Sequence, residues 1–160
     1  MEKKPITNPT ILAVLSAGED RTSLAGIFPG SEWTLHFARV LPEARTLLRR
    51  SHVDVVISDS RLSDGLCWKD LLGEIQAMGG PPPLIVADRL ADEHLWAEVL
   101  NLGAYDLLAK PFDAREVRHA VGAANRHFEN ERRFASGRKP AKPPGQKNVT
   151  GTKAYIAGAG

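Results

Sequence analysis

Hydrophobic residues in this 160-residue chain form two patterns that alternate along the sequence. Short runs that are apolar at nearly every position lie at 10–15, 33–38, 53–58, 83–87 and 105–109. Continuous apolar runs of this length are typical of strands in a parallel sheet that is covered on both faces. The segments 19–28, 42–50, 65–78, 92–102 and 113–132 instead repeat apolar residues every three or four positions, which predicts helices.

The alternation of strands and helices predicts a (βα)5 fold, an α/β doubly wound parallel sheet. With five strands and right-handed crossovers, we expect the flavodoxin-like strand order 2-1-3-4-5. In such a sheet the functional pocket lies at the carboxyl ends of the strands, near the switch between the first and third strands. Site residues are therefore expected at or just after Leu15, Asp59, Asp88 and Lys110.

Composition divides the chain into a body and a tail, because residues 131–160 hold seven of the 21 basic residues and one of the 19 acidic ones. We expect an N-terminal extension at 1–9, one domain at 10–132 and a disordered, basic tail rich in Pro, Gly and Lys at 133–160. A tail of about 30 residues is too short for an output domain. No apolar run is long enough to span a membrane, and the single Cys67 favours a reducing, cytoplasmic location.

Two segments carry further motifs. The sequence VDVVISDSRLSDG at 53–65 is an apolar strand that ends in an aspartate and leads into a turn. The sequence NLGAYDLLAKPFD at 101–113 contains Gly-Ala, then a strand, then Lys-Pro-Phe before a helix start. Both resemble the third and fifth strands of response regulator receiver domains. The resemblance covers roughly residues 10–130, with the five strand–helix pairs in the same order.

The resemblance implies a role in phosphorelay, or two-component, signal transduction. In that family the aspartate that ends the third strand takes a phosphoryl group from a phosphohistidine, and it matches Asp59. The lysine before a cis proline matches Lys110 and Pro111, and its ammonium would bind a phosphoryl oxygen. Implied partners are a histidine kinase or a phosphotransfer protein, reached through helix 4, strand 5 and helix 5, where Trp96 is a candidate anchor. The prediction is a single-domain signalling protein that is not an enzyme.

The family's metal site is altered in this sequence. Receivers bind Mg²⁺ through the phosphoacceptor aspartate, here Asp59, and an acidic pair just after the first strand. A gap-free alignment places Leu15 and Ser16 at that pair, and neither supplies a carboxylate. Glu19 and Asp20 follow one turn later; they could reach inward only if the loop were rebuilt, and we expect them instead to supply favourable charge at the N-terminus of the first helix. We therefore expect at most weak Mg²⁺ binding.

Two further positions differ and leave a second hypothesis open. The hydroxyl residue of the fourth strand aligns with Asp88, which would repel a phosphoryl group or pair with Lys110 or Arg89. The switching aromatic residue of the fifth strand aligns with Leu107, which is expected to fill the core. The alternative to a phosphorylated receiver is a pseudo-receiver that works without phosphorylation, through a fixed cluster of Asp59, Lys110 and Asp88. Only the basic tail supports nucleic-acid binding, and we expect a solvated tail instead.

Overall fold

The computed structural model describes residues 8–30 and 32–135, and these form five strands and five helices. The strands are β1 (Thr10–Val14), β2 (Thr34–Ala38), β3 (Val55–Asp59), β4 (Leu84–Asp88) and β5 (Asp106–Ala109). The helices are α1 (Gly18–Ile27), α2 (Leu41–Arg50), α3 (Trp68–Gln76), α4 (Glu93–Leu102) and α5 (Ala114–Ala135). None of the described helices is long and apolar enough to cross a membrane.

The strands form one parallel sheet in the order β2-β1-β3-β4-β5, which confirms the predicted topology. The register places Asp59 beside Ala87 and Asp88 beside Ala109. The carboxyl ends of β1, β3, β4 and β5 therefore lie along one edge of the sheet. This is the edge to which the sequence assigns the candidate residues.

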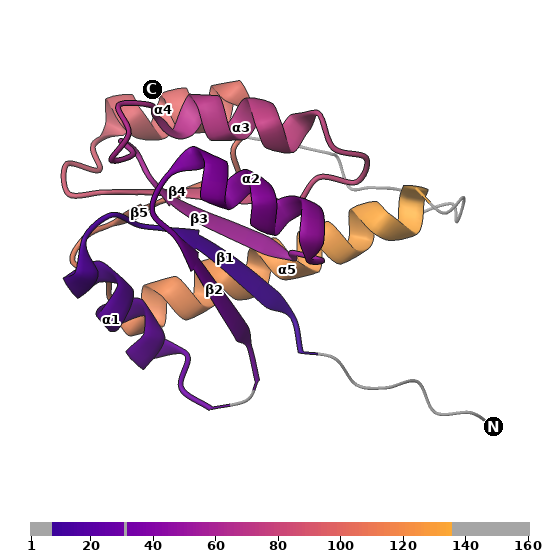
Figure 1. The fold of residues 1–160 in the computed structure, drawn as a ribbon, viewed down its shortest axis with the longest axis horizontal. Helices are drawn as coiled ribbons and strands as arrows, with labels where there is room; N and C mark the ends of the chain where they lie inside the picture. Colours follow the sequence, from indigo (N-terminus) through magenta and orange to yellow (C-terminus); the bar gives the residue numbers. More distant parts are fainter. Residues whose placement is uncertain (1–7, 31, 136–160) are drawn as a thin grey trace. The chain divides into compact units, whose positions relative to one another are not determined.

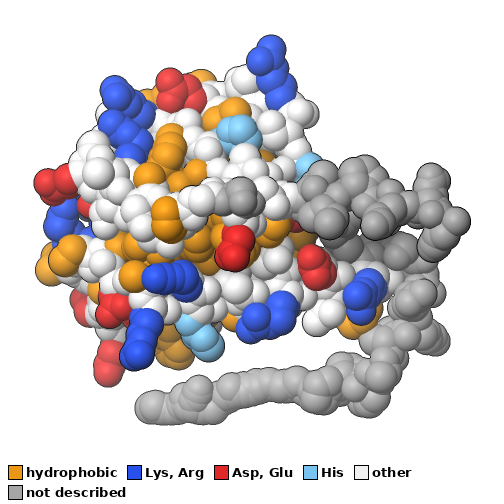
Figure 2. All heavy atoms as spheres, turned by 90° about the horizontal axis from the view of Figure 1, so that it is seen from below, with side chains coloured by type: hydrophobic (Ala, Val, Ile, Leu, Met, Phe, Trp, Pro, Cys, Tyr) orange, Lys and Arg blue, Asp and Glu red, His pale blue; other side chains and the backbone are white. Residues whose placement is uncertain are grey.

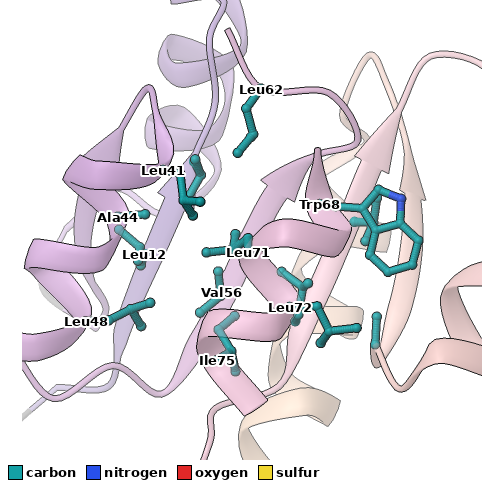
Figure 3. Packing of buried hydrophobic residues seen from close by; sticks show 14 of the residues in the cluster. Leu12, Leu41, Ala44, Leu48, Val56, Leu62, Trp68, Leu71, Leu72 and Ile75 are labelled. Atoms are coloured by element: carbon teal, nitrogen blue, oxygen red, sulfur yellow. The ribbon is translucent and has the colours of Figure 1, made fainter. Parts of the chain in front are cut away.

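Helices cover both faces of the sheet, with α2, α3 and α4 on one face and α1 and α5 on the other (Figure 1). On the first face, the apolar sides of α2 and α3 point toward the sheet residues Leu12 and Val56 (Figure 3). The helix residues that do so are Leu41, Ala44, Leu48, Leu71, Leu72 and Ile75. Burying a leucine or isoleucine stabilises the fold by roughly 1.5–3 kcal/mol, so these contacts hold the two helices in place.

On the opposite face, α5 contributes buried residues that recur every three or four positions: Val117, Val121, Ala124 and Phe128. Partly buried aromatic side chains extend this cluster, and the rings of Phe28 and Trp33 lie 5.6 Å apart. Figure 2 shows hydrophobic side chains that reach the surface in the middle of the view, with charged side chains around them. Helices thus cover both faces of the sheet (Figure 1), and the buried polar residues Ser58 and Asp59 lie at the carboxyl end of β3.

Two helix boundaries differ from the predicted ones by three residues, and the others lie within two residues of the prediction. The third helix begins at Trp68 rather than at residue 65, because Gly65 has a φ of 88°, which is outside the helical region. The last helix continues past residue 132 to Ala135, through a segment in which Arg133 and Ala135 have high helix propensity. Residues 136–160 of the predicted tail and residues 1–7 of the predicted extension lie outside the described part of the chain.

Candidate functional site

Asp59 is the last residue of β3, and only 6% of its surface is exposed. Its Oδ2 accepts hydrogen bonds from the backbone N–H of Ser16 at 2.9 Å and from the Ser16 hydroxyl at 3.2 Å. Its Oδ1 lies 2.6 Å from Nζ of Lys110. A buried carboxylate is costly unless it is paired and hydrogen-bonded. These three donors supply that compensation.

Lys110 directly follows β5, and its side chain is 9% exposed. Its Nζ lies between two carboxylates, 2.6 Å from Asp59 Oδ1 and 2.8 Å from Asp20 Oδ2. Burial by itself lowers the pKa of Lys110, but hydrogen bonds and attraction to both carboxylates outweigh burial and raise the pKa above its ordinary value. The Lys110–Pro111 peptide bond is cis, as the resemblance implied.

Asp20 belongs to this site, although the sequence analysis assigned it to the N-terminus of the first helix. It is 5% exposed and shares the inner face of α1 with Leu24 and Ile27, four and seven residues later. An acid on the apolar face of a helix needs a cation as a partner. That spacing was the signal that could have revealed its inward orientation. The expectation of a helix-terminal role alone is wrong, because the carboxylate reaches Lys110 on the other side of the site.

Arg89 extends the charged cluster from the turn after β4. Its Nη2 lies 3.3 Å from Oε2 of Glu19 and 3.6 Å from Oδ1 of Asp20. The Arg89 and Glu19 side chains are 53% and 77% exposed, so this outer pair adds little stability. Asp20 therefore faces one cation with each carboxylate oxygen: Lys110 on the inside and Arg89 on the outside.

Asp88 lies at the same sheet edge, but its carboxylate is bonded elsewhere. Oδ2 accepts a hydrogen bond from the Ser60 hydroxyl at 3.0 Å, and Oδ1 accepts one from the Leu90 N–H at 3.2 Å. Asp88 is hydrogen-bonded to Lys110 only through the main chain, where its carbonyl accepts from the backbone N–H of Lys110 at 3.1 Å. The prediction of Asp88 as the third member of the fixed cluster was therefore wrong. The third member is Asp20, whose carboxylate lies beside Lys110. The carboxylate of Asp88 instead stabilises the two turns that follow β3 and β4.

The residues at the family's metal position do not fit Mg²⁺. Leu15 is fully buried in the core and offers no side-chain ligand, and Ser16 donates its hydroxyl to Asp59. The backbone carbonyls of Leu15 and Ser16 accept hydrogen bonds from Nη1 of Arg21 at 2.8 and 2.9 Å. Mg²⁺ requires several oxygen ligands in octahedral array. No group of three or more His, Cys, Asp or Glu residues suited to a metal occurs in the described part of the chain.

A second surface feature lies beside β5. Trp96 on α4 is 44% exposed rather than packed in the core. Leu107 is partly buried and packs against the core cluster, as predicted. Both line a shallow hollow of about 290 Å³ together with Ala109 and Glu116. Partner contact through Trp96 stays a prediction.

The ion pair of Asp59 with Lys110 can have one of two roles: it can prepare the carboxylate for attack on a phosphoryl group, or it can only neutralise a buried charge. A carboxylate can attack phosphorus when nearby cations neutralise the charge on the phosphoryl oxygens. Lys110 is positioned to do this for Asp59, since it lies 2.6 Å from one of its oxygens. The same contact can also be a structural ion pair. The geometry is thus compatible with both hypotheses.

Comparison with known proteins gives consistent matches. The sequence profile described as "Response regulator receiver domain" matches residues 20–122, beginning after the position of the missing acidic pair. The response regulator protein PilR of Pseudomonas aeruginosa is 35% identical over 89 residues, which are 56% of this chain and 20% of that protein. The match therefore spans about a fifth of the length of PilR.

Solved structures agree at the level of the fold. The signal receiver domain of an HD domain-containing protein from Pseudomonas fluorescens Pf-5 is similar with a TM-score of 0.72 and 31% identity, over 82% of this chain and 96% of that one. The non-phosphorylated HemR receiver domain from Leptospira biflexa is similar with a TM-score of 0.64 and 26% identity, over 74% and 94%.

Proposed function

Because this chain belongs to the response regulator receiver domain family of two-component signalling, we propose that it accepts a phosphoryl group on Asp59. The contact of Lys110 Nζ with Asp59 Oδ1 at 2.6 Å is the observation that carries the proposal. A carboxylate oxygen of Asp59 forms a bond to phosphorus while the bond from phosphorus to the donor breaks. The electron pair of that bond leaves with the donor group, and Asp59 becomes an acyl phosphate.

The donor in this proposal is a phosphohistidine on a histidine kinase or on a phosphotransfer protein, the partner classes of the family. Receiver domains are in general signalling modules, so we propose no turnover of a small-molecule substrate. Output would occur by protein contact at α4, β5 and α5. The exposed Trp96 and the adjoining hollow support this choice, because a half-exposed aromatic residue beside a shallow depression is a common anchor.

One observation favours a second candidate, a pseudo-receiver that works without phosphorylation. Both oxygens of Asp59 already have donors, and Lys110 is shared with a second buried carboxylate. In this case the ion pairs fix the shape of the sheet edge, and a partner would recognise that fixed shape.

Intact-mass analysis after incubation with acetyl phosphate distinguishes the two candidates. We expect the wild type to gain one phosphoryl group and Asp59→Asn to gain none. Glu98→Gln is the control, since it changes an acid that pairs with Lys69 outside the Lys110 cluster and should leave the mass gain unchanged. Wild-type protein that stays unmodified with both small phosphodonors and a phosphohistidine donor would refute phosphorylation of Asp59 and leave the second candidate.

A further inference from the structure

Asp20 holds two cations beside the proposed phosphoacceptor. Its Oδ2 lies 2.8 Å from Lys110 Nζ, and its Oδ1 lies 3.6 Å from Arg89 Nη2. The ammonium comes from the end of β5 and the guanidinium from the turn after β4. One carboxylate on α1 thus brings together positive groups from two strand ends.

The inner part of the cluster is balanced without a metal ion. The two buried carboxylates have two cations as partners: Lys110 lies between Asp59 and Asp20, and Arg89 lies beside Asp20. A phosphoryl group on Asp59 would add negative charge, which needs cations close to its oxygens. Lys110 can supply one of them. The guanidinium of Arg89 presents several N–H groups in a planar fork that matches phosphate oxygens.

The geometry points to a two-cation clamp: we propose that Arg89 binds the phosphoryl group on Asp59 together with Lys110, in the place that a divalent cation has in the family. This inference rests on the proposed phosphorylation of Asp59. Arg89 is 53% exposed and its partner Glu19 is 77% exposed, so little interaction energy opposes a move from Glu19 to the phosphoryl oxygens. Asp20 is the positioning residue, since it holds Arg89 at the pocket before the phosphoryl group arrives.

The test compares phosphorylation of the full chain by acetyl phosphate in EDTA and in Mg²⁺, measured as the initial rate by intact mass. We expect the wild type to react at similar rates in both buffers, within about twofold. In enzymes, removing one hydrogen-bond donor that stabilises the developing charge lowers the rate by about 10²–10³-fold. Because Arg89 is half-exposed, we expect Arg89→Gln to lower the initial rate of phosphorylation by a smaller factor, about tenfold. Arg89→Lys should recover only part of that loss, because it keeps the positive charge but not the planar fork of N–H donors.

Arg39→Gln is the matched control, because Arg39 is an exposed arginine directly after β2 at the same sheet edge. Binding of beryllofluoride, a mimic of the acyl phosphate, is followed by ¹⁹F NMR without metal and supplies a readout independent of the donor. Unfolding midpoints in urea verify that each variant is folded. We expect beryllofluoride to bind the wild type and Arg39→Gln, and to bind Arg89→Gln much more weakly.

The outcomes separate this inference from the function on which it rests. Wild-type phosphorylation that requires Mg²⁺, or an Arg89→Gln rate equal to that of the wild type, would overturn the clamp and leave Asp59 as the acceptor. If the wild type shows no phosphorylation and no beryllofluoride binding, both the clamp and the phosphorylation of Asp59 are overturned. Beryllofluoride binding that depends on Arg89, without transfer from acetyl phosphate, would support the clamp and count against this donor route.

Discussion

Replacing Lys110 by methionine removes the ammonium that lies between the carboxylates of Asp59 and Asp20. Both carboxylate side chains are less than a tenth exposed, so they would be left as buried charges. Removing one partner of a buried ion pair costs about 3–5 kcal/mol. Asp59 keeps its two bonds from Ser16, and Asp20 keeps Arg89 nearby, so we expect a loss of about 2–4 kcal/mol in the free energy of unfolding.

Urea denaturation followed by intrinsic tryptophan fluorescence measures this loss, since the buried Trp68 becomes exposed on unfolding. The control is Lys69→Met, which breaks the more exposed ion pair with Glu98 and should change stability little. The double variant Lys110→Met with Asp20→Asn should be more stable than Lys110→Met alone, because one of the two uncompensated charges is gone. If Lys110→Met unfolds at the same urea concentration as Lys69→Met, the ion-pair cluster does not stabilise the fold as argued.

Three further outcomes follow from the described geometry. Gly103→Ala should lower the free energy of unfolding by about 1 kcal/mol, measured in urea, because Gly103 has a φ of 105°, a conformation that residues with a Cβ rarely adopt. Ser16→Asp should raise Mg²⁺ affinity in calorimetry relative to the wild type, since it adds a carboxylate next to Asp59; unchanged affinity would contradict this. The raised pKa of Lys110 contributes stability that is present below the ordinary lysine pKa and is lost as the pH rises through the raised value. Melting temperatures measured at alkaline pH should therefore fall in the wild type by an amount that is absent in Lys110→Met.

The sequence predicted the sheet well because its signals are local. Fully buried parallel strands are apolar at almost every position, and β1, β4 and the first three residues of β3 meet that condition. The predicted end of the fourth helix also held, because Gly103 adopts the left-handed conformation that ends α4. The start of α3 was harder to predict, since the helical spacing extends into a segment where Gly65 forms a turn.

The candidate site was predictable only where it depends on strand ends. The contact of Asp59 with Lys110 follows from the parallel sheet, because both residues end strands at one edge. The role of Asp20 depends on which face of α1 packs inward, and its position near the helix start suggested a simpler role. The partners of Arg89 depend on the direction of a long side chain from a turn, which no sequence period determines.

Leu15 gives the sheet edge a dynamic property as well as a chemical one. Its side chain has no exposed surface, and its N–H is bonded to the carbonyl of Ala38 on β2 at 3.0 Å. Amides of this kind exchange their hydrogen only when a large cooperative unit opens, since small local fluctuations do not expose them. The backbone next to Ser16 and Asp59 therefore belongs to the slowly exchanging interior rather than to a mobile loop. We therefore expect the amide of Leu15 to be among the slowly exchanging ones, and charge rearrangement beside it to proceed by side-chain rotation.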